Sequence, residues 1–226
     1  MERFRRGATL MPGLSDEEIG RLQRRISAPI PEPIRELLRY AAGFQLPSVG
    51  SVQFTGAGTV DLPGALPESL ALLADGSGNF WVVDIDPANG AWGPVFFVCH
   101  DPPVLAMQAP ELGAFLFQIL APAESTPGNA LAYVQDECVA RIWKHDPWLT
   151  PAREAGASHD PALFRFAQQV PDTFRIADLR SREVGSGFSW GSAGADAEVR
   201  RAGNDLIFAA EQRRPGFLRK ILSRSR

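Results

Sequence analysis

The chain has 226 residues, 45% of them hydrophobic, and a formal net charge of −3, values typical of a globular protein with a buried core. No run of about 18 apolar residues occurs, so we expect no membrane-spanning helix, and the first residues lack the apolar stretch of a secretory signal. The only cysteines are Cys99 and Cys138, which excludes a disulfide scaffold and a cysteine-based metal site, and a cytoplasmic location is expected.

The charges are distributed unevenly along the chain. No Lys or Arg occurs between residues 40 and 140, whereas the same stretch holds ten acidic residues, and all 23 basic residues lie outside it. An acidic middle of this kind would speed the encounter with a basic partner and would repel nucleic acid. Alternatively, the acids are scattered over a solvated surface and mark no site.

Two helices are predicted near the N-terminus, after a loose basic leader at residues 1–13. The first begins at Ser15, because Ser15 and Glu18 have the spacing of a capping box, and apolar residues then follow at helical intervals. The second has Pro33 in its first turn and an apolar face, and we expect Gly43 to cap its end.

Residues 75–103 predict an antiparallel ribbon in the middle of the chain. A Gly-rich turn at 75–79 precedes an apolar strand at 80–85, an Asn-Gly turn at 86–90 follows, and a second apolar strand runs over 95–99. The sequence His-Asp-Pro-Pro at 100–103 ends this strand, because proline cannot donate to a β-ladder.

The same residues carry a resemblance to a known family. The G-x-G-N-F-W opening, the V-D strand, the G-P-V entry and the H-D-P-P close resemble the central sheet of the SUKH superfamily, and the segments at 30–43 and 111–120 resemble its flanking helices. The superfamily includes fungal cell-wall-assembly regulators of the Smi/Knr type and bacterial immunity proteins. The resemblance covers about residues 14–121, although Ala42 stands where the family has Asn. It implies an α+β fold with a mainly antiparallel sheet flanked by helices.

The remaining elements divide the chain into three expected parts. Within the SUKH-like domain (14–121), residues 49–54 and 104–107 predict short strands, 67–74 a short helix or strand, and 110–121 a helix. A helical connector (122–170) would hold helices at 129–143 and 161–169, with a linker at 149–159. A small β subdomain (171–212) would have strands at 173–180, 198–201 and 205–210, the last two joined by a Gly203-Asn204 turn.

The last residues predict a terminal amphipathic basic helix. They carry six positive charges and no acid, and the apolar residues Phe217, Leu218, Ile221 and Leu222 would share one face. Such a segment could contact an anionic membrane surface weakly, or it could be a solvated or frayed end. The candidates for contact with an anionic surface are Arg213, Arg214, Arg219, Lys220 and Arg224.

Several residue patterns could carry chemistry, but each also has a structural interpretation. His100, His145 and His159 each precede Asp-Pro; a catalytic or metal role is conceivable, but Asp-Pro is also a frequent turn and helix opening. Asp84 and Asp86 could form a carboxylate pair, or Asp84 could be a polar strand residue and Asp86 part of a turn. Ser189 lies in a G-x-S-x-G sequence, but no His follows it, which excludes the hydrolase order.

Taken together, these patterns predict a non-catalytic protein-binding module without a cofactor or metal. The resemblance implies an immunity-type protein that binds and neutralises a cognate toxin, often a nuclease, and a basic toxin would suit an acidic face. Trp81 is expected in the core and Trp92 at the surface as an aromatic anchor. The predicted partner-binding residues are Asp75, Asp84, Asp86, Trp92, Asp101 and Glu111. The alternatives are a regulatory scaffold that binds several cellular proteins, and an enzyme that uses His100 and nearby carboxylates.

Overall fold

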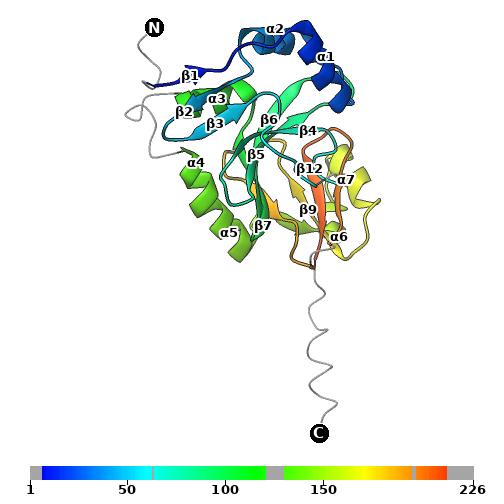
Figure 1. Cartoon of the computed structure of the whole chain (residues 1–226). Coiled ribbons are helices and arrows are strands. Elements are labelled where there is room, and N and C mark those ends of the chain that lie inside the picture. The colour runs from blue at the N-terminus through cyan, green and yellow to red at the C-terminus, as the bar shows by residue number, and fades with distance from the viewer. Residues whose placement is uncertain (1–6, 63, 121–129, 195–196, 213–226) are drawn as a thin grey trace.

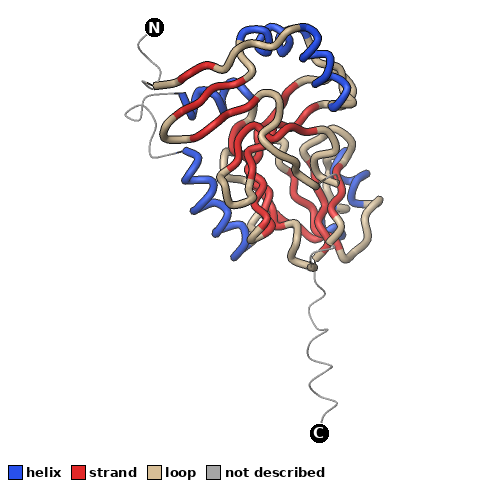
Figure 2. Tube along the Cα trace, viewed as in Figure 1, coloured by secondary structure: helices blue, strands red, loops and turns tan. Residues whose placement is uncertain are grey.

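The structure, a computed structural model, describes residues 7–62, 64–120, 130–194 and 197–212. These residues form the predicted α+β fold, in which antiparallel strands build three sheets and helices pack against them (Figures 1 and 2). The expected terminal basic helix lies outside the described residues.

The two N-terminal helices form as predicted, with one correction. Helix α1 (Asp16–Arg25) begins with the capping box, because the Ser15 hydroxyl accepts a hydrogen bond from the Glu18 amide and the Glu18 carboxylate accepts one from the Ser15 amide. Helix α2 (Glu32–Tyr40) ends at Ala41, so the prediction that Gly43 caps it is wrong. Gly43 instead begins a strand, where an added Cβ would come within 2.1 Å of the Val52 carbonyl oxygen.

A small N-terminal sheet connects these helices to the rest of the molecule. Its strand order is β1-β2-β3, formed by β1 (Thr9–Leu10), β2 (Gly43–Leu46) and β3 (Gly50–Gln53). Part of the expected leader is therefore a strand: Thr9 and Leu10 pair with Gln45 and Phe44.

The predicted ribbon is the middle of a five-stranded antiparallel sheet with the order β10-β7-β6-β5-β4. The ribbon strands are β5 (Phe80–Ile85) and β6 (Trp92–His100), flanked by β4 (Ser69–Ala74), β7 (Pro103–Ala109) and β10 (Gly187–Ser189). Side chains alternate between the two faces, so Trp81 and Val83 belong to one core cluster and Val82 to another. Both faces of this sheet are therefore buried.

Helices cover the first face. These are α1 and α2, then α3 (Leu112–Leu120), and a continuous helix made of α4 (Ala130–Ala132), the π-helical segment η2 (Tyr133–Cys138) and α5 (Val139–His145). The last of these corresponds to the helix predicted at 129–143, and its apolar residues Leu131, Val134, Cys138 and Ile142 are all buried, as their spacing indicated.

A second antiparallel sheet, built from the C-terminal part of the chain, covers the other face. Its order is β11-β12-β9-β8, formed by β8 (Leu149–Pro151), β9 (Phe174–Asp178), β11 (Val199–Arg201) and β12 (Ile207–Glu211). Phe208 and Ala177 from this sheet pack with Phe96, Val82 and Leu105 from the central sheet. The outer side of the second sheet is covered by α6 (Ala152–Ala155) and α7 (Pro161–Ala167).

Strand pairing crosses the boundaries expected for the C-terminal half. Residues 149–159 are not a linker, because they form β8 and α6, and β8 pairs with β9. Nor do the residues after 171 form a separate unit, since β10 pairs with β7 of the central sheet.

A buried ion pair joins the two large sheets. The Arg201 guanidinium donates to both carboxylate oxygens of Asp84 at 2.7 Å, and each side chain is only 7% exposed. The remaining donors of Arg201 reach the carbonyl oxygens of Asp205, Ala65 and Asn204. Because every charged atom has a partner, this pair fixes one arrangement of the sheets rather than leaving a charge buried alone.

Candidate functional site

One end of the central sheet carries two turns that lie side by side, the β4–β5 turn and the β6–β7 turn. In the first, the Asp75 carboxylate accepts hydrogen bonds from the amides of Ser77 and Asn79 and from the Asn79 side chain. The Asn79 side-chain oxygen in turn accepts a hydrogen bond from the His100 amide at the start of the second turn. Asp75 and Asn79 therefore hold the two turns together.

The His100 side chain also takes part in this contact between the two turns. Its Nδ1 lies 2.8 Å from the Asn79 Oδ1. Because the Asn79 amide nitrogen donates to Asp75, its oxygen is the acceptor, and Nδ1 of His100 carries the proton. Among the described residues no carboxylate forms an ion pair with His100.

The charges of Asp75 and Asp101 both affect the pKa of the Cys99 thiol. Burial raises the pKa of the Cys99 thiol, and the negative charges of Asp75 and Asp101 raise it further. Both carboxylates thus lie close to Cys99 although they come from different turns. Asp101 is exposed, and Asp75 is half-buried in its turn.

The segment η2 contacts the first turn through Gln135 and carries two exposed carboxylates. The Gln135 side chain donates to the Asp75 carboxylate at 3.4 Å, and Asp136 and Glu137 follow it in the chain. The nearby cation, Arg141, donates instead to the Gly185 carbonyl and lies over the Trp148 ring. We name the group of Asp75, Asp101, Asp136 and Glu137 the hairpin-tip surface.

The other predicted partner-binding residues do not belong to this surface. Asp86 follows β5, and Glu111 follows β7, so both lie at the opposite end of the sheet. A six-residue strand such as β5 spans roughly 20 Å. The predicted set therefore does not form one contiguous face.

Two of the predicted residues are not at the surface. Asp84 is 5% exposed and forms the ion pair with Arg201, so its placement on a partner-binding face is wrong. Trp92 is 9% exposed and packs in the core with Trp81, so the prediction of a surface anchor is also wrong, whereas the core position of Trp81 is confirmed. The sequence correctly predicted that Asp84 is a polar residue of a strand. Its partner Arg201 lies 117 residues away, so no local pattern in the sequence indicates the ion pair.

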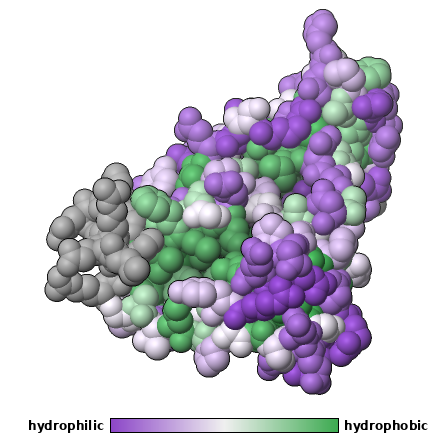
Figure 3. Space-filling view, turned by 90° about the horizontal axis from the view of Figure 1, so that it is seen from above, coloured by the Kyte–Doolittle hydropathy of each residue, from purple (hydrophilic) through white to green (hydrophobic). Residues whose placement is uncertain are grey.

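The exposed apolar side chains lie elsewhere. Seen from above in Figure 3, apolar side chains gather in one area bordered by polar ones. Over the whole described chain, the large apolar residues with the greatest exposure are Leu10, Tyr40, Phe117, Tyr133, Trp143 and Phe164. Of these, Tyr133 belongs to η2, the segment that supplies two carboxylates of the hairpin-tip surface.

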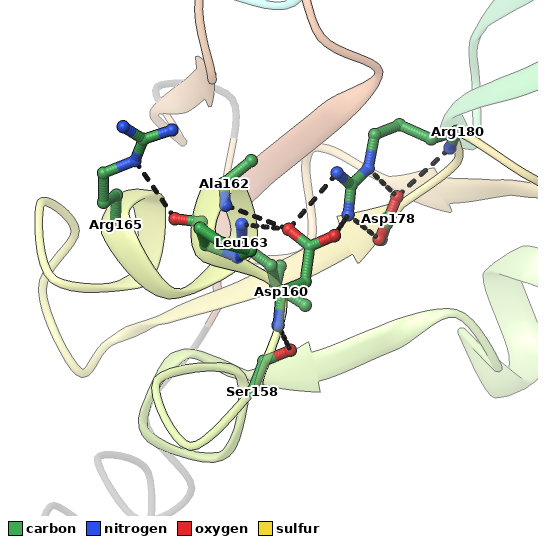
Figure 4. Close-up of polar contacts among 8 residues, drawn as sticks. Ser158, Asp160, Ala162, Leu163, Arg165, Asp178 and Arg180 are labelled. Carbon is green, nitrogen blue, oxygen red and sulfur yellow. Dashed lines mark hydrogen bonds and ion pairs between the residues drawn. The ribbon is translucent and has the colours of Figure 1, made fainter.

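A second polar group lies on the outer side of the C-terminal sheet, in a depression of about 500 Å³ (Figure 4). Asp160 accepts hydrogen bonds from the amides of Ala162 and Leu163 and so caps α7, as the Asp-Pro pattern predicted. Arg180 lies between Asp160 and Asp178, 3.1 Å and 2.7 Å from their oxygens. Arg180 lowers the pKa of Asp178. The charges of Asp160, Asp178 and Arg180 are paired with one another, so this group of three stabilises the fold.

Three features remain to be placed, namely the basic residues of the tail, a possible metal site and a possible membrane span. Arg213, Arg214, Arg219, Lys220 and Arg224 lie outside the described residues. Within the described part of the chain, no cluster of His, Cys, Asp and Glu has the arrangement of a metal site. No described helix is long and apolar enough to cross a membrane.

Comparison with known proteins agrees with the architecture of the first half of the chain. Residues 13–118 match the SMI1 / KNR4 family (SUKH-1). This segment belongs to the SUKH-1 family. It ends within α3, so all strands of the C-terminal sheet, and β10, lie outside the SUKH-1 match. No curated protein and no solved structure matches the chain.

Proposed function

We propose that this chain is a protein-binding module of the immunity type, which binds a basic partner, such as a toxin that acts on nucleic acid, and blocks it. The observation that carries the proposal is the hairpin-tip surface. Its four carboxylates have no ion pair among the described residues.

The contrast with the other acidic residues supports this proposal. Asp16 and Glu32 both pair with Arg39, and Glu198 pairs with Arg200. Asp75 and Asp101 have no arginine or lysine close along the chain, because none occurs between residues 40 and 140. Arg141 lies four residues after Glu137, but it donates to the Gly185 carbonyl and forms no ion pair with Glu137 among the described residues. Carboxylates that no ion pair neutralises produce an outward negative field, which steers a basic protein and sets its orientation.

The burial of the central sheet favours its end over its faces as the binding region. Helices cover one face and the C-terminal sheet covers the other, so a partner would meet turns and helix surfaces. We propose a non-catalytic role in the cytoplasm, consistent with SUKH-1 membership and with two free, buried cysteines.

The test is affinity capture from lysate of the native cell with variants that reverse the surface charge. Asp75 is left unchanged, because it holds the β4–β5 turn. The exposed residues are replaced together, as Asp101→Lys, Asp136→Lys and Glu137→Lys. We expect the wild-type chain to retain a basic protein at low salt and to lose most of it at high salt, and the variant to retain little at either.

A matched control makes the same charge change elsewhere. Glu154, Asp172 and Glu183 are exposed and have no ion pair among the described residues, and their triple replacement by Lys should leave capture intact. If both triple variants lose capture equally, the effect depends on the net charge of the chain and not on the hairpin-tip surface. Retention of several unrelated cellular proteins would favour a regulatory scaffold, and no retained protein at either salt would overturn the proposal.

A further inference from the structure

Three buried hydrogen-bond donors in the C-terminal half have no partner. They are Nε of Arg175, Nε1 of Trp190 and Nε2 of Gln212, and none bonds to any group in the described chain. A buried donor without a partner is destabilising, and native structures rarely leave one unexplained. Three donors without partners in one region indicate a missing acceptor.

Strand register places two of these residues on the same face. Arg175 of β9 pairs with Ala210 of β12, and the Gln212 amide donates to the Thr173 carbonyl. Residues two apart on a strand point to the same side, so the side chains of Arg175 and Gln212 share the side of Ala210. Ala210 packs in the core between the two large sheets, so both donors point toward the central sheet.

Trp190 lies on the central-sheet side of the same interface between the two large sheets. It follows β10, its amide donates to the Pro103 carbonyl, and its ring packs against the core between the sheets. Ser192, two residues later, donates to the Gln212 side-chain oxygen at 2.8 Å. That bond uses the Gln212 oxygen and leaves its amide nitrogen as the free donor.

The Arg175 guanidinium also forms no ion pair among the described residues. No hydrogen bond or ion pair joins it to another described residue. The Asp146 carboxylate interacts with Arg175 electrostatically, since the pKa of Asp146 is raised by burial and lowered in part by Ser189 and Arg175. The Ser189 amide and hydroxyl donate to the two oxygens of Asp146, and no hydrogen bond or ion pair joins Asp146 to Arg175.

We propose that Arg175, Trp190 and Gln212 form a binding site for an oxyanion, a phosphate or a carboxylate, at the edge between the two large sheets. The three free atoms are all donors, and an arginine that forms no ion pair among the described residues can bind the planar, charged oxygens of such a group. A water molecule could accept from at most two of these donors and would leave the guanidinium charge unpaired. The site does not depend on the proposed partner binding.

The experiment uses the full chain labelled with ¹⁵N and follows tryptophan indole resonances during titration with inorganic phosphate and, separately, with acetate at constant ionic strength. The Trp190 signal is assigned with Trp190→Phe. We expect a saturable shift of the Trp190 indole, while the Trp81 indole, which donates to Gln108 at 2.9 Å, stays unchanged as an internal reference. Stronger binding of phosphate identifies a phosphate site, and stronger binding of acetate identifies a carboxylate site.

Charge-matched variants connect the shift to the site. Arg175→Met should weaken binding by roughly tenfold or more, because a charge-assisted hydrogen bond is lost. Arg182→Met removes an exposed guanidinium whose Nε donates to the Asp178 carbonyl, and it should bind as the wild type does. If Arg175→Met does not fold, Gln212→Glu tests the same point, because a carboxylate there repels the anion. A Trp190 indole that moves with neither anion, or that moves equally in the Arg175 and Arg182 variants, overturns the proposal.

Discussion

Replacement of Arg201 with Met tests whether the two large sheets are held in place by a charge pair. The variant leaves Asp84 buried, 7% exposed at its side chain, without a cation. Removing one partner of a buried ion pair costs about 3–5 kcal/mol, because the remaining charge stays desolvated. With so little exposure, solvent screening does not reduce this value. The loss is a large part of the roughly 5–15 kcal/mol that stabilises a typical domain.

The measurement is urea denaturation followed by circular dichroism. Arg200→Met is the matched control, since Arg200 is the neighbouring arginine and pairs with Glu198 at the surface, where the side chains are 38% and 53% exposed. We expect the control to cost about 1 kcal/mol or less.

The double variant Asp84→Leu with Arg201→Met separates charge from packing. Apolar replacement of both partners of a buried pair is often neutral or stabilising, so we expect recovery of most of the loss. The reasoning is refuted if Arg201→Met and Arg200→Met have the same free energy of unfolding, or if the double variant is less stable than either single one.

Three further predictions concern the same architecture. Asp178→Asn should lower stability at neutral pH and should matter less as the pH falls below about 4. The pKa of Asp178 is lower in the folded chain than in the unfolded chain, so its charge contributes stability above the unfolded pKa, and this contribution is lost as the pH falls through the folded pKa. Urea midpoints of both proteins, measured against pH, test this. Gly64→Ala should destabilise the chain more than Gly93→Ala, because a Cβ added at Gly64 would meet the Val199 carbonyl oxygen at 2.0 Å, whereas the nearest atom at Gly93 is the Asp84 carbonyl oxygen at 3.6 Å. Thermal unfolding compares the two variants, and equal melting temperatures would contradict the close approach at Gly64. The segment 7–120 expressed alone should expose the second face of the central sheet, with side chains such as Phe96 and Leu105. The lost burial of that whole face is worth on the order of 10 kcal/mol, so the segment should bind a hydrophobic dye. Sharp, cooperative unfolding of the segment would disprove this prediction.

Local patterns predicted the elements whose cause is local. The Ser15–Glu18 capping box lies within one helical turn, and β5 has the residues Phe80–Ile85 that its β-branched and aromatic composition indicated. The Asp160-Pro161 pair opened a helix because both residues act on its first turn. In each case the interacting groups are a few residues apart, so their spacing in the sequence fixes their geometry.

What the sequence missed depends on distant pairing. Residues 149–159 are small and polar, yet Leu149–Pro151 form a strand because β9 offers a free edge. Trp92 follows a turn and was expected at the surface, but the helices packed on that face bury it. The acidic residues between 40 and 140 share a stretch of sequence, but antiparallel strands carry alternate turns to opposite ends of the sheet, so the predicted set was divided.

The C-terminal sheet changes what the central sheet can do. An antiparallel sheet with one face covered by helices could offer its other face to a partner. In this chain that face meets β9, β11 and β12 of the same molecule, and the Asp84–Arg201 pair aligns the two. We propose that a partner meets turns and helix surfaces instead, where the carboxylates of the hairpin-tip surface form no ion pair among the described residues. The arginine closest to Glu137 along the chain, Arg141, donates instead to the Gly185 carbonyl and lies over the Trp148 ring, so no ion pair with it neutralises these carboxylates.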